Sequence, residues 1–148
     1  MQELTSLSEI NKNYDWKWLG LDFSNVRLIG SEGFKNPEKI KNFYFNEWNH
    51  IILKYSNKRL PKAFRTNFIL AQDYAFYESN MRQDINSLVI NKAYELNERQ
   101  IQEIVNKYPI NTDAQITLSF IVESFNKVTL KAFIWVAIID AKTNQIIL

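Results

Sequence analysis

The sequence predicts one α/β domain over residues 1–148, with a mixed, mainly antiparallel sheet and two helices packed on it. Residues 116–125 and 128–139 both alternate in the manner of strands around a short turn, as in an antiparallel hairpin. Upstream, two segments carry apolar residues at helical spacing behind recognisable N-terminal caps. Residues 1–14 are largely polar, and we expect a flexible N-terminal segment there.

The first strand is expected at residues 19–29, where apolar side chains dominate. Trp16 and Trp18 precede it, in alternation with charged neighbours. Ser24 and Asn25 interrupt the apolar pattern, so we expect the strand to break near them.

The first helix begins at Asn36, a favoured N-cap residue, followed by Pro37, which suits the first helical position. We expect the helix to run to about Ser56 and to end in the basic loop at residues 57–61. Its apolar residues fall on one stripe, which we expect to be buried against the sheet. The stripe consists of Ile40, Phe43, Tyr44, Trp48, Ile51, Ile52 and Tyr55.

The middle of the chain is predicted to hold two short strands and a second helix. The strands are the apolar runs at residues 68–71 and 88–90, with a loop or irregular helix between them. The helix follows Asn97, which forms a capping-box pattern with Gln100, and Pro109 prevents its continuation. Its buried face is expected to be Ile101, Ile104, Val105 and Tyr108.

The C-terminal strands give the clearest signal. The second half of the strand at residues 128–139 is apolar on both faces, which predicts a central strand covered on both sides. Asp140 and Asn144 bound the next turn, and Asn144 suits the left-handed conformation usually given to glycine. Residues 145–148 are expected to form a strand that pairs antiparallel with residues 136–139.

Composition excludes several functional classes. The absence of cysteine removes disulfides, thiolate nucleophiles and most structural zinc sites. A net charge of +2 does not indicate a polyanionic partner, so no nucleic acid is expected. The apolar runs are too short to span a bilayer. Met1 leads directly into polar residues, so for an exported protein we expect the targeting segment to have been removed.

His50 is the only residue that titrates near neutral pH without help. It lies one helical turn from Glu47, and such a pair can transfer protons. A lone histidine beside a carboxylate on a helix is more often a surface pair, so we assign it no catalytic role. The alternative is a small enzyme or ligand-binding protein that uses His50 and nearby carboxylates in a pocket.

Three carboxylates, Asp22, Glu123 and Asp140, lie in or next to predicted strands. Two acids at strand ends could share a metal ion or flank a substrate bond. Asp140, however, is expected to bond its own backbone in a turn. Glu123 alternates with Thr117 and Ser119, which indicates a solvent-exposed face. We therefore predict no metal and no cofactor.

Five basic residues surround the predicted end of the first helix, as a phosphate or anionic lipid site would require. The helix dipole favours positive charge there without any ligand. Phe133 and Trp135 could stack bases, but burial explains these rings better. The five basic residues are Lys54, Lys58, Arg59, Lys62 and Arg65.

The order of the elements and four stretches of sequence carry a resemblance. The stretches are residues 22–25, 44–49, 104–108 and 120–127. The chain resembles uncharacterised small bacterial envelope proteins with an α/β domain, and its layout is similar to the accessory domain of TolB-type and curli-secretion-type envelope proteins. The resemblance implies a periplasmic or envelope-associated protein, with a cytoplasmic one as the alternative, and it transfers no site residues. The function we predict is a non-enzymatic binding or assembly module of a bacterial cell envelope, with an unknown protein partner.

Overall fold

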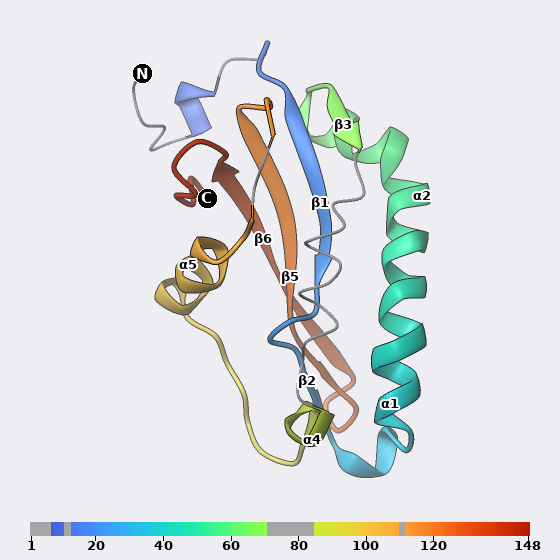
Figure 1. Ribbon diagram of the computed structural model, residues 1–148. Coiled ribbons are helices and arrows are strands. Elements are labelled where there is room, and N and C mark those ends of the chain that lie inside the picture. Colours follow the sequence, from blue (N-terminus) through green and yellow to red (C-terminus); the bar gives the residue numbers. More distant parts are fainter. Residues whose placement is uncertain (1–6, 11–12, 71–84, 110–111) are drawn as a thin grey trace.

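One sheet lies between two helical layers (Figure 1). The computed structural model describes residues 7–10, 13–70, 85–109 and 112–148. Its strands are β1 (Trp16–Asp22), β2 (Arg27–Ile29), β3 (Phe68–Leu70), β4 (Val89–Ile90), β5 (Ile116–Asn126) and β6 (Lys131–Asp140). Its helical segments are η1 (Leu7–Glu9), η2 (Ser31–Gly33), α1 (Pro37–Lys39), η3 (Ile40–Tyr44), α2 (Phe45–Phe64), α4 (Ile85–Leu88) and α5 (Glu98–Asn106).

Strand β5 is the centre of the sheet. β1 pairs with the first half of β5 and β2 with its end, so β1 and β2 form one interrupted line along the same side of β5. β3 and β4 lie outside β1 and β2, and β6 takes the other side of β5. The break between β1 and β2 falls where Ser24 and Asn25 predicted it.

The prediction of a mainly antiparallel sheet is wrong. Every strand pair is parallel except β5 with β6. The hairpin dominated the sequence pattern because a short turn is a local signal. Parallel strands need long crossovers, and here α2 separates β2 from β3 while α5 separates β4 from β5. The alternation of strands with helices was therefore the better guide to the sheet.

The two long helices cover opposite faces of the sheet (Figure 1). Val122 of β5 belongs to a buried cluster with Phe45 of α2, whereas the preceding residue, Ile121, packs with Val105 of α5. Successive strand residues point to opposite faces, so each helix buries one side of β5. The predicted capping box of α5 is confirmed, since Asn97 and Gln100 exchange side chain to backbone hydrogen bonds of 2.9 Å.

The first helix departs from its predicted stripe because it contains a π turn. α1, η3 and α2 follow one another without interruption, and the π turn at η3 adds one residue to the helical repeat. The apolar face consequently shifts by one position, and Phe45 is buried. Of the predicted stripe, Ile40, Trp48 and Ile52 pack on the core, whereas Phe43, Tyr44 and Ile51 are exposed.

The same helix does not end at Ser56 as predicted but continues to Phe64. Its last turns contain Pro61, which costs a helical hydrogen bond. Leu60 and Phe64 nevertheless pack against the buried Trp16 and Trp18. Tertiary contacts of these two side chains therefore override the local signal of the proline.

Strand β6 is buried only at its end. Its last four residues, 137–140, are buried as predicted, but its first half is exposed. Within the part of the chain that the structure describes, β6 pairs with β5 and otherwise only with the C-terminal tail, so it is not central. Residues 145–148 do run antiparallel to the end of β6, through a single bridge between Ile139 and Ile146 rather than a regular strand.

Other predictions are met where the structure describes them. The short strands at β3 and β4 are present, and Lys142 N–H donates to Asp140 Oδ1 at 2.9 Å in the predicted turn. Asn144 there has a φ of 59°. Most of the loop or irregular helix predicted before β4, and most of the flexible segment predicted at the N-terminus, lie outside the described residues. Of the described N-terminal residues, Ile10 and Tyr14 pack against the cluster of Trp16 and Trp18.

The π turn makes a testable prediction about two neighbouring phenylalanines of the first helix. Phe45 stacks on Phe23 with ring centroids 4.2 Å apart and is 3% exposed, whereas Phe43 is 51% exposed. Phe45→Ala should lower the free energy of unfolding by about 3–5 kcal/mol through a buried cavity. Phe43→Ala, the matched control, should change it by less than about 1 kcal/mol. Equal losses in urea denaturation would show that the π turn does not set the buried face.

Candidate functional site

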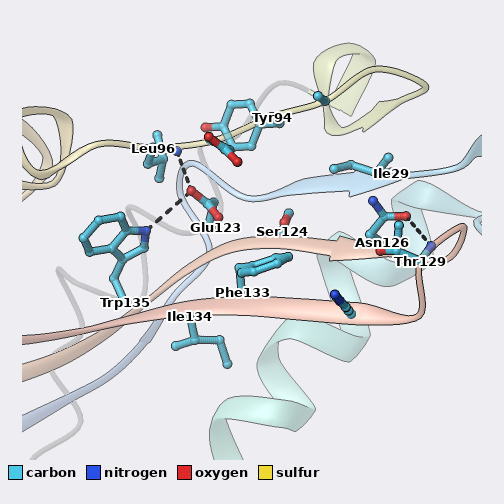
Figure 2. A pocket seen from close by; sticks show the side chains of 13 residues that line it. Ile29, Tyr94, Leu96, Glu123, Ser124, Asn126, Thr129, Phe133, Ile134 and Trp135 are labelled. Atoms are coloured by element: carbon cyan, nitrogen blue, oxygen red, sulfur yellow. Dashed lines mark hydrogen bonds between the residues drawn. The ribbon is translucent and has the colours of Figure 1, made fainter.

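A cleft of about 540 Å³ opens between β5, β6 and the segment that follows β4 (Figure 2). It lies towards the carboxyl ends of the parallel strands β2 and β5, the position where open α/β sheets usually bind ligands. We call it the Glu123 cleft. It is lined by Ile29, Ala93, Tyr94, Glu95, Leu96, Glu123, Ser124, Asn126, Thr129, Lys131, Phe133, Ile134 and Trp135.

Glu123 is the unpaired residue of a β-bulge beside this cleft. Val122 pairs with Ile134 and Ser124 with Phe133, so Glu123 is the extra residue on β5. On the other side of β5, residues 23–26 form the break between β1 and β2. Both irregularities occur at the same level of the sheet, because Asp22 pairs with Ile121 and Arg27 with Ser124. The central strand therefore has no regular neighbour on either side at Glu123.

Glu123 is 5% exposed, and within the described part of the chain its carboxylate accepts hydrogen bonds through one oxygen only. Oε1 accepts from the backbone N–H of Leu96 and, at 3.5 Å, from the indole Nε1 of Trp135 (Figure 2). Among the described residues, no donor reaches Oε2 and no lysine or arginine forms an ion pair with Glu123. Of the described residues, the enclosed polar side-chain atoms without a partner are Trp18 Nε1 and Thr117 Oγ1. Oε2 of Glu123 is not one of them, so this oxygen is open to the cleft and available to a ligand.

Tyr94 holds the opposite wall of the cleft in place. Its hydroxyl donates to the carbonyl of Asn25 at 2.8 Å, inside the break between β1 and β2. The Arg27 guanidinium lies 5.1 Å from the centre of the Tyr94 ring. Burial raises the pKa of the Tyr94 hydroxyl above its ordinary 10.0, with Arg27 lowering it and Glu123 raising it further. The hydroxyl therefore stays protonated at neutral pH and keeps the wall attached to the break.

A second buried polar group, centred on Asp22, lies on the same face but has a structural role. Asp22 is 1% exposed, and its Oδ1 accepts from the backbone N–H and hydroxyl of Ser24, at 2.8 and 2.5 Å. Its Oδ2 accepts from the Tyr108 hydroxyl at 2.5 Å, and Ser119 lies 3.2 Å from that hydroxyl. Both carboxylate oxygens are thus satisfied within the protein, and they fix the end of β1 to the segment after α5.

The residues singled out by sequence do not converge. His50 and Glu47 are exposed on α2, on the face opposite α5. Asp140 is at the other end of the β5–β6 pair, opposite Ile116, and Asp22 is enclosed by its own partners. The predicted pocket around His50 therefore has no support in the described structure. Of the predicted basic cluster, Lys54, Arg59, Lys62 and Arg65 are exposed, and the side chain of Lys58 is outside the description.

The prediction that Glu123 faces solvent is wrong. Alternation along β5 assigned it to an outer face, but that face is covered by residues 93–96 and by Trp135. The bulge and the covering segment are long-range features without a local sequence signal. The only available sign was the carboxylate itself, placed inside an otherwise apolar stretch of strand.

Other kinds of site are missing from the described residues. No cluster of three or more histidine, cysteine, aspartate or glutamate side chains among them is arranged to hold a metal ion. None of the described helices combines the length and the apolar composition that a membrane crossing needs.

Comparison with known proteins gives no match to a protein-family model, a curated protein or a solved structure. The resemblance to envelope proteins therefore stays a prediction.

The Asp22–Tyr108 contact predicts a specific dependence of stability on pH. Burial, followed by the charge of Asp22 and its hydrogen bond, raises the pKa of Tyr108 well above its ordinary 10.0. Above pH 10 the unfolded chain releases this proton and the folded chain retains it. The Tyr108 contribution to stability is thus complete below pH 10 and lost above it, by up to about 1.4 kcal/mol per pH unit.

Tyr108→Phe isolates this effect. At about pH 8 the variant should be less stable by about 1–3 kcal/mol, because Asp22 loses a buried donor. As the pH rises past 10 the gap between wild type and variant should shrink, since only the wild type carries the titrating hydroxyl. Urea denaturation of both proteins measures the gap. A gap that stays constant up to about pH 11 would contradict the assignment.

Proposed function

We propose that this chain is a non-enzymatic binding module whose ligand occupies the Glu123 cleft. The observation that carries the proposal is the largely buried Glu123, whose two donors are both on Oε1 and whose Oε2 is left open to the cleft. The ligand we infer is a small organic cation, with an ammonium or guanidinium group attached to an apolar body. The bacterial envelope remains part of the proposal through the resemblance alone.

The cationic group of the ligand is inferred from the charge balance of the cleft. A ligand nitrogen bonded to Oε2 would satisfy the remaining lone pairs of a carboxylate that has no cationic partner among the described residues. Lys131 also lines the cleft, and Asn126 and Thr129 lie near the hairpin end. Asn126 Oδ1 is already occupied, because it accepts from the backbone N–H groups of Val128 and Thr129. Glu123 is therefore the anchor that favours one sign of charge.

The apolar body of the ligand is inferred from the walls. Phe133 and Trp135 present ring surfaces to the cleft, together with Ile29 and Leu96 (Figure 2). Phe133 is 49% exposed although it is a large apolar side chain. The hydrogen bond to Glu123 orients the Trp135 indole, and its ring can stack on an aromatic ligand or make a cation–π contact. An aromatic or branched aliphatic ligand would cover these rings.

Binding is favoured over catalysis by the chemistry of the lining. Ser124, Thr129 and Tyr94 are its hydroxyl residues, and none is hydrogen-bonded to Glu123 in the described structure; the Tyr94 hydroxyl donates to the carbonyl of Asn25 instead. A nucleophile needs a base within hydrogen-bonding reach, and this cleft provides no such pair. The proposal is thus for recognition by charge and apolar contact without covalent chemistry.

A pair of probes with the same shape and opposite charge tests the proposal. 2-Phenylethylammonium should raise the melting temperature and change tryptophan emission, because Trp135 lines the cleft. Phenylacetate should do neither at the same concentration, since its carboxylate would meet Glu123. Glu123→Gln keeps an acceptor for Leu96 and Trp135 but removes the charge, and should weaken ammonium binding by at least about tenfold.

Glu95→Gln is the matched control. Glu95 lines the same cleft but is exposed, so its charge is screened by water and its loss should change the affinity by less than about threefold. Equal binding of the ammonium and the carboxylate probe, or an unchanged affinity in Glu123→Gln, would exclude the anchor. Equal losses in both glutamate variants would point to a general charge effect.

A further inference from the structure

We propose that two copies of this chain pair through the outer edges of β6, antiparallel, about a two-fold axis at Ile134. The proposal rests on the backbone of β6 and on the exposed side chains along it. It does not require the ligand proposed for the Glu123 cleft, although β6 also lines that cleft.

The direction of the backbone groups of β6 is fixed by its contacts with the C-terminal tail. Ile138 N–H donates to the carbonyl of Leu148 at 2.7 Å, and Asp140 N–H donates to that of Gln145 at 2.9 Å. Even-numbered residues thus turn their backbone groups away from β5. The bulge opposite β6 is on β5, so β6 itself is regular, and Ala132, Ile134 and Val136 also point outward. Nothing in the described structure bonds to the outward groups of these three residues.

The tail shows what kind of segment this edge accepts. Ile146 bridges Ile139 in the antiparallel sense, and Ile147 N–H donates to the carbonyl of Ile138 at 2.7 Å. Among the described residues, the bonds of the tail to this edge reach Ile138, and none is made to the outward backbone groups of residues 132–136. An antiparallel strand is therefore the occupant that continues the existing pattern along β6.

The uncovered part of β6 is apolar and carries little protection against pairing. Phe133, Ile134 and Val136 are 49%, 46% and 48% exposed. Natural edge strands usually carry lysines, prolines, inward-pointing charges or bulges that prevent pairing. On β6 the only charge before Asp140 is Lys131, at the first position, and the strand contains no proline. These features are those of an interface strand.

The edge is complementary to a second copy of itself. With Ile134 on the axis, Ala132 of one copy lies opposite Val136 of the other. The three outward-facing residues of one copy, Ala132, Ile134 and Val136, therefore pair with the same three residues of the second copy. Hydrogen-bonded antiparallel pairs exchange two bonds each, which gives about six backbone hydrogen bonds. Phe133 then lies opposite the second copy's Trp135 on the α5 face, and the two Glu123 clefts adjoin across the axis.

The single charge on the edge also finds a partner. In this register Lys131 lies opposite the second copy's Ala137. Ala137 lines a groove of about 470 Å³ between α5 and β6, and Glu98 at the start of α5 lines the same groove. Arg99 also lines this groove but already forms an ion pair with Glu103 at 3.3 Å. Glu98 is therefore the partner that we infer for Lys131 on each side of the symmetric pair. Charge complementarity favours a second copy over an unrelated apolar strand.

Cysteine cross-linking tests the pairing directly, because the natural chain contains no cysteine. Ile134→Cys should form an intermolecular disulfide readily, since Cα atoms of a hydrogen-bonded pair lie about 5.5 Å apart, within disulfide range. Ile51→Cys is the control: Ile51 is 48% exposed, like Ile134, but lies on α2. Under mild oxidation Ile134→Cys should cross-link more than about tenfold faster, because pairing raises the effective thiol concentration. Equal rates would overturn the proposal.

A charge exchange tests the register in the unmodified fold. Lys131→Glu and Glu98→Lys should each weaken the dimer several-fold in sedimentation equilibrium, since each places like charges together. The double variant should restore the wild-type dimerisation constant. Ile134→Pro should abolish the dimer without unfolding the chain, because it removes an outward N–H from an edge strand. A monomer at all concentrations, or a dimer that none of these variants changes, would overturn the proposal.

Discussion

The carboxylate of Glu123 lies in the central strand of the sheet, and its need for hydrogen-bond donors governs the geometry around it. A charged group in this position cannot be enclosed by apolar neighbours without a large cost. Alternation along β5 puts it on the α5 face, where the N–H of Leu96 and the indole of Trp135 meet it, and the bulge leaves it without a partner on β6. The segment before α5 is attached at that point, and Tyr94 fastens the same segment to the break between β1 and β2. The bulge, the break and the cleft are therefore parts of one arrangement.

Asp22 is a buried carboxylate in the same protein whose two oxygens both accept hydrogen bonds from protein groups, in contrast to Glu123. Ser24 supplies two donors to one oxygen, and Tyr108 supplies a donor to the other. The two acids lie on neighbouring lines of the sheet and on the same face, yet only Glu123 borders a cleft. This contrast within one chain is the reason to treat Asp22 as structural and Glu123 as a binding group.

The sequence predicted the local elements well and their assembly poorly. Caps at Asn36 and Asn97 located both helices, because a cap is a contact between residues three positions apart. The π turn before Phe45 was not predictable from spacing, since it changes the helical period on which the stripe was based. Parallel pairing and the burial of Glu123 depend on residues distant in sequence, and a single sequence contains no direct record of such contacts. The hairpin, by contrast, is a local feature, so it dominates the pattern although it supplies the one antiparallel pair among the described strands.

Strand β6 takes part in both the proposed ligand site and the proposed dimer interface, and it uses different groups for each. Its odd-numbered side chains, Phe133 and Trp135, face α5 and form the wall of the cleft, whereas the outward backbone groups belong to the even-numbered residues. A ligand would therefore contact the side chains of Phe133 and Trp135, whereas an added strand would bond to the backbone groups of the even-numbered residues. The two are nevertheless in contact, because Phe133 of one copy would lie opposite Trp135 of the other. Pairing would reduce the exposure of Phe133, which also lines the cleft, so ligand binding and pairing would each affect the surroundings of the other.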